Sequence, residues 1–140
     1  MSRKATALLY AAVSLAITAV SGSAQAACPI AGKWFATQFA SNNGGGTFSA
    51  TCTWTIRPNG NYSGPCLTTS IGASPASGTS TGIIKSNAQC RVSGVIKGVG
   101  FGDTTIDGGI VTNDGTQIVF TGHRKNPADQ VRIVILNKID

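Results

Sequence analysis

The sequence predicts an all-β protein: a single small up-and-down antiparallel β-barrel of about eight strands, stapled by disulfides, with a flattened β-sandwich as the alternative. Three observations predict it. Short runs rich in Val, Ile, Thr and aromatic residues alternate with turn residues along the chain. No window of about ten residues keeps apolar side chains at helical spacing. Four cysteines follow an N-terminal stretch that is typical of an export signal.

Residues 1–26 are predicted to be a cleaved secretory signal peptide. Arg3 and Lys4 form its positive start, and a charge-free apolar stretch follows over 5–20. Ala24-Gln25-Ala26 then provides a small-x-small cleavage site. The apolar stretch is shorter than the roughly 20 residues of a membrane-spanning helix, so we expect no membrane span.

Lipid attachment at Cys28 is an alternative fate of this terminus. Such sites usually carry Leu three residues before the cysteine, where this chain has Gln25. We therefore expect a secreted or periplasmic protein with one β-barrel domain over 27–140, and a lipoprotein only as the alternative.

The chain after the signal is mildly basic. Removal of Arg3 and Lys4 from the eleven Lys and Arg leaves nine cations against five Asp, a net charge of about +4. These cations are scattered, whereas nucleic-acid binders cluster them and add aromatic residues for stacking. We therefore expect no nucleic-acid partner.

Eight segments have the composition of strands. In chain order they cover 33–40, 47–57, 61–68, 79–85, 89–97, 104–111, 116–124 and 130–138. Most separators are short and rich in Gly, Asn, Asp or Pro, as at 42–46, 58–60, 86–88, 113–115 and 126–129. The longest separator, 69–78, is predicted to be a mobile loop. Closure of these strands into a barrel removes the exposed edges that an open sheet must protect.

The second and third strands are predicted to form a hairpin around 58–60. Pro58 fits the first central position of a type I turn, and Gly60 fits the left-handed position after it. The register that follows places Cys52 opposite Cys66 at a non-hydrogen-bonded pair, where Cα atoms approach to about 4.5 Å. Pro65 cannot donate a hydrogen bond in this ladder, so we expect a bulge or a strand end there.

These cysteines are predicted to be structural. The Cys-x-x-Cys spacing of zinc and redox sites is absent. The hairpin register favours a Cys52–Cys66 disulfide over the other pairings, and Cys28–Cys90 then follows by elimination. The same register turns Trp54 and Tyr62, with both hairpin cysteines, toward the core.

At Gly32-Lys33-Trp34 the first strand opens with Gly-x-Trp. Here the chain resembles calycin-type barrels, which include lipocalins, avidin-like proteins and the bacterial Inh-type metalloprotease inhibitors. The layout is most similar to the Inh type, because a cysteine-bracketed hairpin follows and 114–120 looks like that family's Asp-Gly hairpin. The resemblance implies that Gly32 and Trp34 close one end of the barrel and that a late basic residue, Arg132 or Arg124, packs across Trp34.

No catalytic or metal site is indicated. His123 is the only histidine, and beside two cations near a hairpin end it is predicted to lie on the surface. No Cys/His cluster has metal-ligand spacing. We expect neither an enzyme nor a bound cofactor.

The sequence therefore predicts an exported binding protein. The first hypothesis is a protein-binding or protease-inhibitor-like barrel. The run 131–136 is apolar on both faces, so its outer face either meets a partner or a second copy or carries tolerated surface apolar groups. A second hypothesis is a carrier of a small apolar ligand, because a barrel of about eight strands is either just filled by its side chains or wide enough for one small ligand. Four interior aromatic residues are predicted to be core, or to face such a ligand if the barrel holds one: Trp34, Trp54, Tyr62 and Phe120. A third is a structural envelope protein without a specific ligand.

Overall fold

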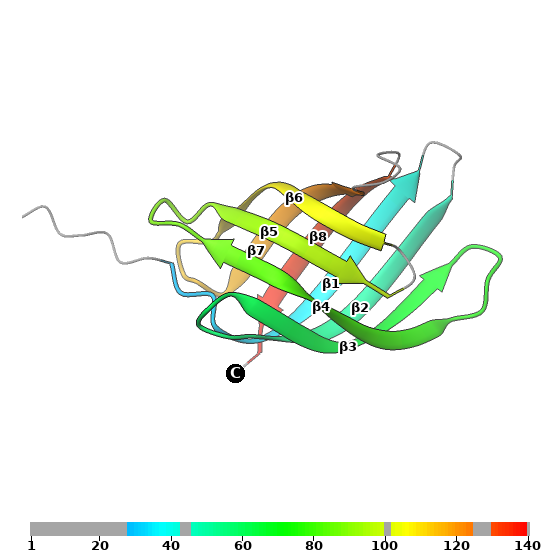
Figure 1. Ribbon diagram of the computed structural model, residues 1–140, viewed down its shortest axis with the longest axis horizontal. Helices are drawn as coiled ribbons and strands as arrows, with labels where there is room; N and C mark the ends of the chain where they lie inside the picture. The colour runs from blue at the N-terminus through cyan, green and yellow to red at the C-terminus, as the bar shows by residue number, and fades with distance from the viewer. Residues whose placement is uncertain (1–27, 43–45, 100–101, 125–129, 140) are drawn as a thin grey trace, which may run out of the picture.

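Eight antiparallel strands close into a barrel in the computed structural model, which describes residues 28–42, 46–99, 102–124 and 130–139 (Figure 1). The strands are β1 (Gly32–Asn42), β2 (Thr47–Ile56), β3 (Asn61–Ser70), β4 (Ala76–Ser86), β5 (Val92–Gly98), β6 (Gly102–Val111), β7 (Gln117–Arg124) and β8 (Gln130–Lys138). The predicted signal peptide lies outside the described residues.

Each strand pairs with the next one along the chain, and β8 returns to β1. This last pairing runs from Trp34 opposite Lys138 to Asn42 opposite Gln130. The sheet therefore has no free edge, which confirms the predicted barrel over the sandwich alternative.

Two predicted strand starts differ from the structure by three residues, and the other predicted boundaries agree to within two. β5 begins at Val92 rather than at Gln89, because the side chain of Asn87 accepts hydrogen bonds from the backbone N–H groups of Gln89 and Arg91 and holds a turn there. The predicted loop 69–78 is shorter than expected. Its second end continues the β3–β4 ladder as far as Ala76 opposite Thr68, where the Thr68 hydroxyl donates a hydrogen bond to the carbonyl oxygen of Ala76 over 3.0 Å.

The β2–β3 hairpin has the predicted register. Cys52 lies opposite Cys66, with a Cα–Cα distance of 4.1 Å, and the two are disulfide-bonded. The ladder between these strands is interrupted opposite Gly64 and Pro65, as Pro65 predicted. A Cβ on Gly64 would lie 1.8 Å from the carbonyl oxygen of Thr53, so only glycine fits where the two backbones approach.

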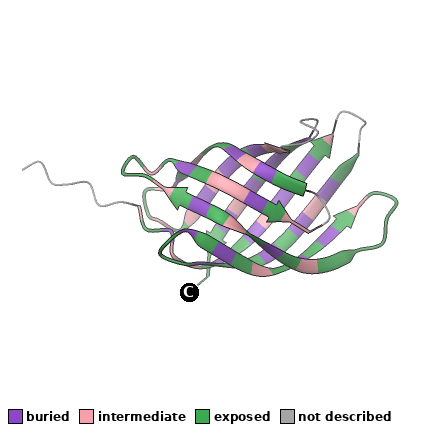
Figure 2. Cartoon of the chain, in the orientation of Figure 1, coloured by how far each residue is buried: buried purple, intermediate pink, exposed green. Residues whose placement is uncertain are grey.

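The barrel interior divides into two halves along its long axis. The apolar half lies toward the N-terminal end, where the β2–β3, β4–β5 and β6–β7 turns gather at the left of Figure 1. The polar half lies toward the opposite end, where the odd-numbered strands finish. Buried and exposed residues alternate along the strands in both halves, which shows that one face of every strand fills the interior (Figure 2).

The apolar half is a packed core. Its large side chains are buried and come from seven of the strands: Trp34, Ile56, Ile84, Val92, Val111, Ile118, Phe120, Val134 and Leu136. Trp34 closes the end of the barrel, where its Nε1 donates a hydrogen bond to the carbonyl oxygen of Ile30 over 2.8 Å. The Cys28–Cys90 disulfide joins this N-terminal segment to the β4–β5 turn, in agreement with the predicted pairing.

The basic residue over Trp34 is not the predicted one. Lys138 of β8 places its Nζ 5.9 Å from the centre of the Trp34 ring. Arg132 lies near the start of β8, away from Trp34, and its guanidinium is over the ring of Phe48. The difference arises because β8 runs antiparallel to β1, so that its last residues, not its first, reach the Trp34 end.

Candidate functional site

The polar half of the interior carries an unusual set of buried side chains. Polar and charged residues with little or no exposure come from β1, β3, β4, β6 and β8: Gln38, Thr68, Ser80, Thr104, Gln130 and Arg132. Small barrels of this strand number normally fill their interior with side chains or enclose one small ligand. A polar interior at one end only is therefore the first feature that distinguishes a candidate site from core.

One hydrogen-bonded chain runs along the wall formed by β3, β4 and β5. The Tyr62 hydroxyl and Ser80 Oγ lie 3.1 Å apart, and Ser80 Oγ donates to the carbonyl oxygen of Lys97 over 3.0 Å. Burial raises the pKa of Tyr62, so the phenol stays protonated. The ring of Tyr62 also packs at 4.4 Å from Trp54, at the boundary between the two halves.

A second chain crosses from β8 to β2. Arg132 Nη1 donates to Gln38 Oε1 over 3.3 Å, and Gln38 Nε2 donates to Sγ of the Cys52–Cys66 disulfide over 3.1 Å. Burial above all lowers the pKa of Arg132 to about 10; Tyr62 counteracts the shift and the neighbouring Arg124 cation adds to it. Because this pKa stays above neutral pH, the interior holds a positive charge.

Four further buried atoms have no hydrogen-bond partner among the residues that the structure describes. They are Trp54 Nε1, Thr104 Oγ1, Gln130 Oε1 and Arg124 Nε. Buried polar groups in native proteins are nearly always hydrogen-bonded, and one left unpaired costs about 1–3 kcal/mol. Trp54, Thr104 and Gln130 are only 0%, 1% and 6% exposed, so bulk water does not satisfy them.

Three of these atoms come from adjoining strands. Thr104 pairs with Arg124 across β6 and β7. His123 pairs with Val131 across β7 and β8. The next residue on each strand is Arg124 and Gln130, so these two lie beside one another. The unpartnered groups of Thr104, Arg124 and Gln130 therefore form one cluster, with Arg132 next to it on β8.

Small side chains face this polar half from the other wall. On β1 and β2 the inward positions beside Gln38 are Ala36, Ala40 and Ala50, all buried, and the larger Phe48 follows them opposite Ala40. An alanine leaves much of the volume that Leu or Phe would fill at the same position. The arrangement combines polar groups on one wall with space-saving residues on the other, as ligand pockets do.

The four residues predicted to face the interior are all buried. Trp34 and Phe120 belong to the packed apolar half, whereas Trp54 and Tyr62 lie at its boundary with the polar half. Sequence reasoning missed Gln38, Thr104 and Gln130. A signal was present in the alternation of β1, where Gln38 stands between the inward-facing Ala36 and Ala40.

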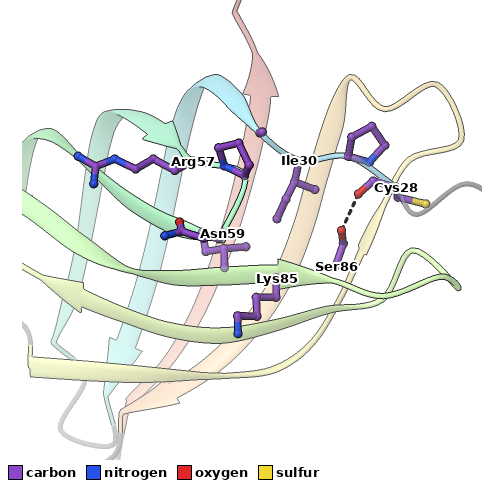
Figure 3. A pocket seen from close by; sticks show the side chains of 11 residues that line it. Cys28, Ile30, Arg57, Asn59, Lys85 and Ser86 are labelled. Carbon is purple, nitrogen blue, oxygen red and sulfur yellow. Dashed lines mark hydrogen bonds between the residues drawn. The ribbon is translucent and has the colours of Figure 1, made fainter.

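A separate cleft of about 460 Å³ lies at the apolar end of the barrel, between the N-terminal segment and the β2–β3 turn (Figure 3). Its floor is formed by Ile30 and Ile84, and Ser86 Oγ donates across one side to the carbonyl oxygen of Cys28 over 2.5 Å. Arg57 lines the cleft but extends away from Ile30 in Figure 3. The charged ends do not converge on one point, so this cleft is the weaker candidate.

The outer face carries one pair with the chemistry of a proton relay. His123 Nδ1 and Asp107 Oδ1 are hydrogen-bonded, and both side chains are nearly half-exposed. Their exposure agrees with the predicted surface position of His123. No hydroxyl in the described part of the chain is hydrogen-bonded to this pair, as a nucleophile activated by it would be.

No group of three or more His, Cys, Asp or Glu side chains is placed to hold a metal ion within the described residues. The same residues include no helix long and apolar enough to cross a membrane.

Comparisons with known proteins show the fold. No protein-family model matches the chain, and no curated protein matches it. Among solved structures, EF1p2_mFAP2b bound to DFHBI is 16% identical with a TM-score of 0.55, covering 83% of this chain and 98% of that one. The redesigned beta barrel b11L5F_LGL is 17% identical with a TM-score of 0.53, covering 86% and 100%.

A third structure, the redesigned beta barrel mFAP1 bound to DFHBI, is 17% identical with a TM-score of 0.51, covering 81% of this chain and 99% of that one. These proteins are eight-stranded antiparallel barrels of calycin-like fold. They support the predicted barrel, whereas nothing in the comparisons supports the specific resemblance to Inh-type inhibitors.

Proposed function

We propose that this chain is an exported binding protein that holds one small ligand in the polar half of its barrel. The observation that carries the proposal is the set of buried, unpartnered polar atoms on Trp54, Thr104 and Gln130. A ligand that hydrogen-bonds to them would remove a cost of about 1–3 kcal/mol for each atom. Ligand sites pair a few such groups with a wall that leaves space, and Ala36, Ala40 and Ala50 provide that wall.

The comparisons agree with this proposal at the level of the fold. Two of the similar barrels are described as bound to DFHBI, so a barrel of this shape can hold a small molecule. The polar groups here favour a ligand with hydrogen-bonding atoms over the purely apolar ligand that the sequence predicted. Trp34, Phe120 and the rest of the apolar half are already packed against one another.

The first test is native mass spectrometry of the protein recovered from its own exported compartment without reductant. We expect a chain covering 27–140 with both disulfides formed, carrying one additional small mass that is lost on denaturation. The same spectrum tests both proposals: the mass of the chain tests the export signal, and the additional mass tests the ligand. A chain with lipid on Cys28 would overturn cleavage after Ala26, and a chain with water only would overturn the ligand.

A matched pair of variants locates the ligand in the barrel. Thr104→Val removes the unpartnered hydroxyl inside, whereas Thr53→Val removes an exposed hydroxyl on the outer face of β2. We expect the additional mass to be lost or strongly reduced in Thr104→Val and kept in Thr53→Val. Equal retention in both variants would place the ligand outside the polar half.

Protein binding on the outer face is a second candidate function. Phe39, Ile133 and Val131 are 53%, 47% and 59% exposed, and Phe39 pairs with Ile133 across β1 and β8. Adjacent exposed apolar side chains of this size favour contact with another protein. Light scattering of the protein and of its Phe39→Ser variant tests self-association: a mass that stays monomeric in both would rule it out.

A further inference from the structure

The polar groups around the interior also indicate what kind of ligand they would bind, and this inference rests on the proposed function. The unpartnered atoms differ in whether they can donate or accept hydrogen bonds. Trp54 Nε1 and Arg124 Nε can only donate hydrogen bonds, Thr104 Oγ1 can donate or accept, and Gln130 Oε1 can only accept. The excess of donors calls for a ligand that is rich in acceptor atoms.

The existing hydrogen bonds point the same way. Gln38 Nε2 donates to the sulfur of Cys52, and sulfur is a weak acceptor. A side-chain amide N–H donates to such a weak acceptor where stronger acceptors are scarce. The Gln38 amide donor is therefore paired only with a weak acceptor.

Two guanidinium groups face the same region. Arg132 is buried and Arg124 is close enough to lower its pKa, which means that the two cations repel one another. A Cβ on Gly102 would lie 3.1 Å from Arg124 Nε, so the glycine leaves room for the Arg124 side chain. The three aspartates in the described ranges, Asp103, Asp107 and Asp114, all have exposed side chains.

From this geometry we infer that the ligand is a small organic anion whose carboxylate accepts hydrogen bonds from Arg124 and Thr104, with a hydroxyl or amide N–H beside the carboxylate that donates to Gln130. A carboxylate suits Arg124 because hydrogen bonds between ionised groups are about twice as strong as neutral ones. The donor beside it is required by Gln130 Oε1, which can only accept. The body of the ligand would extend toward Trp54 and its ring partner Tyr62.

Three related probes test the inference. Mandelate carries both the carboxylate and the neighbouring hydroxyl, phenylacetate lacks the hydroxyl, and mandelamide lacks the charge. Each is titrated into the full protein after its own ligand has been removed by denaturation and refolding with the disulfides intact. Binding is followed by thermal unfolding and by tryptophan fluorescence, since the body of the ligand would extend toward Trp54. We expect mandelate to bind about tenfold more tightly than mandelamide, with phenylacetate between them.

Two variants show whether the preference comes from the proposed group. Arg124→Gln should reduce the affinity for mandelate and bring the ratio of mandelate to mandelamide close to one. Arg91→Gln removes an exposed cation far along the β4–β5 turn and should leave both affinities and their ratio unchanged. The ratio is the decisive readout, because a variant that merely loosens the barrel weakens both probes together.

The outcomes that overturn the inference differ from those that overturn the proposed function. Mandelamide binding as tightly as mandelate, or no shift with mandelate at any concentration, overturns the anionic ligand. The small mass retained by the native protein is read independently of these probes. If that mass is present but belongs to a neutral compound, the binding function stands and the anion is wrong; if it is absent, the binding function itself fails.

Discussion

The two halves of the barrel interior differ in whether their buried polar atoms are hydrogen-bonded, although the same eight strands build both. In the apolar half, Trp34 is fully buried, and its only polar atom has a partner in Ile30. In the polar half, Thr104 and Gln130 are also buried, but each keeps an atom without a hydrogen-bond partner among the described residues. Burial costs nothing extra in the first case, whereas it destabilises the folded protein in the second.

The difference indicates a division of labour along the barrel axis. The apolar half has the Cys28–Cys90 disulfide at its end and contains the closely packed large apolar side chains, so we expect it to supply most of the stability. That stability allows the polar half to keep groups that are optimal for a ligand and unfavourable without one. Proteins commonly carry such a trade-off between stability and function at their binding sites.

The largest effect should come from the apolar half. Trp34→Ala is expected to lower the free energy of unfolding by about 3–5 kcal/mol, because it leaves a cavity at the closed end of the barrel. Phe39→Ala on the same strand is the control, since this side chain is exposed and should cost less than about 1 kcal/mol. Urea denaturation measures both. Similar losses in the two variants would mean that Trp34 is not the closing residue of a packed core.

Loss of the Cys28–Cys90 disulfide should lower the free energy of unfolding more than loss of Cys52–Cys66, because Cys28–Cys90 closes the longer loop. Cys28→Ala/Cys90→Ala removes a bond with a sequence separation of 62, and Cys52→Ala/Cys66→Ala removes one with a separation of 14. The chain-entropy model predicts losses of about 4 and about 3 kcal/mol. Thermal and urea unfolding of both double variants checks this order. A larger loss at Cys52–Cys66 would show that its place beside Gln38 contributes more than loop closure.

Two buried threonines should respond with opposite signs. Thr104→Val removes a hydroxyl without a partner in the described residues and should raise the free energy of unfolding of the ligand-free protein by about 1 kcal/mol. Thr68→Val removes a hydroxyl that donates to the carbonyl oxygen of Ala76 and should lower it by about the same amount. A loss of stability in Thr104→Val would contradict the comparison, because its hydroxyl would then have a protein partner.

The smallest effect should come from Asp114 in the β6–β7 turn, at the apolar end. Hydrogen bonds from Thr112 and Thr116 lower the pKa of this carboxyl from 3.8 to about 2. Because the folded pKa lies below the unfolded one, the stabilisation is fully present above pH 3.8 and is lost as the pH falls toward 2. Titration of the carboxyl carbon by NMR measures the pKa directly. Thr116→Val should raise it, and an unchanged pKa in that variant would show that Thr116 does not contribute.

Local sequence signals predicted the elements well where each strand has a simple alternation. The hairpin around Pro58 and Gly60 has its expected register, and Pro65 marks the interruption of the ladder. The prediction failed at Gln89, where the side chain of Asn87 accepts hydrogen bonds from backbone N–H groups and β5 begins only at Val92. Such a competition between a turn and a strand depends on contacts that composition does not reveal.

The candidate site could be predicted only in part. Trp54 and Tyr62 were expected in the interior because hairpin register and aromatic character suffice to place them. The expected partner of Trp34 was wrong, since the choice between Arg132 and Lys138 depends on how β8 aligns with β1, the most distant pair of strands in the sequence. Thr104, Arg124 and Gln130 meet only because three strands lie side by side.

By itself the sequence determined the secondary structure, the cysteine pairing and the inward face of each strand, because these follow from alternation, turn chemistry and short-range register. Only the tertiary structure decided that the sheet closes and that its interior is apolar at one end and polar at the other. The physical reason is that closure sets the level at which residues from different strands meet. Gln38 and Arg132 are separated by 94 positions in the chain, yet they share a hydrogen bond inside the barrel.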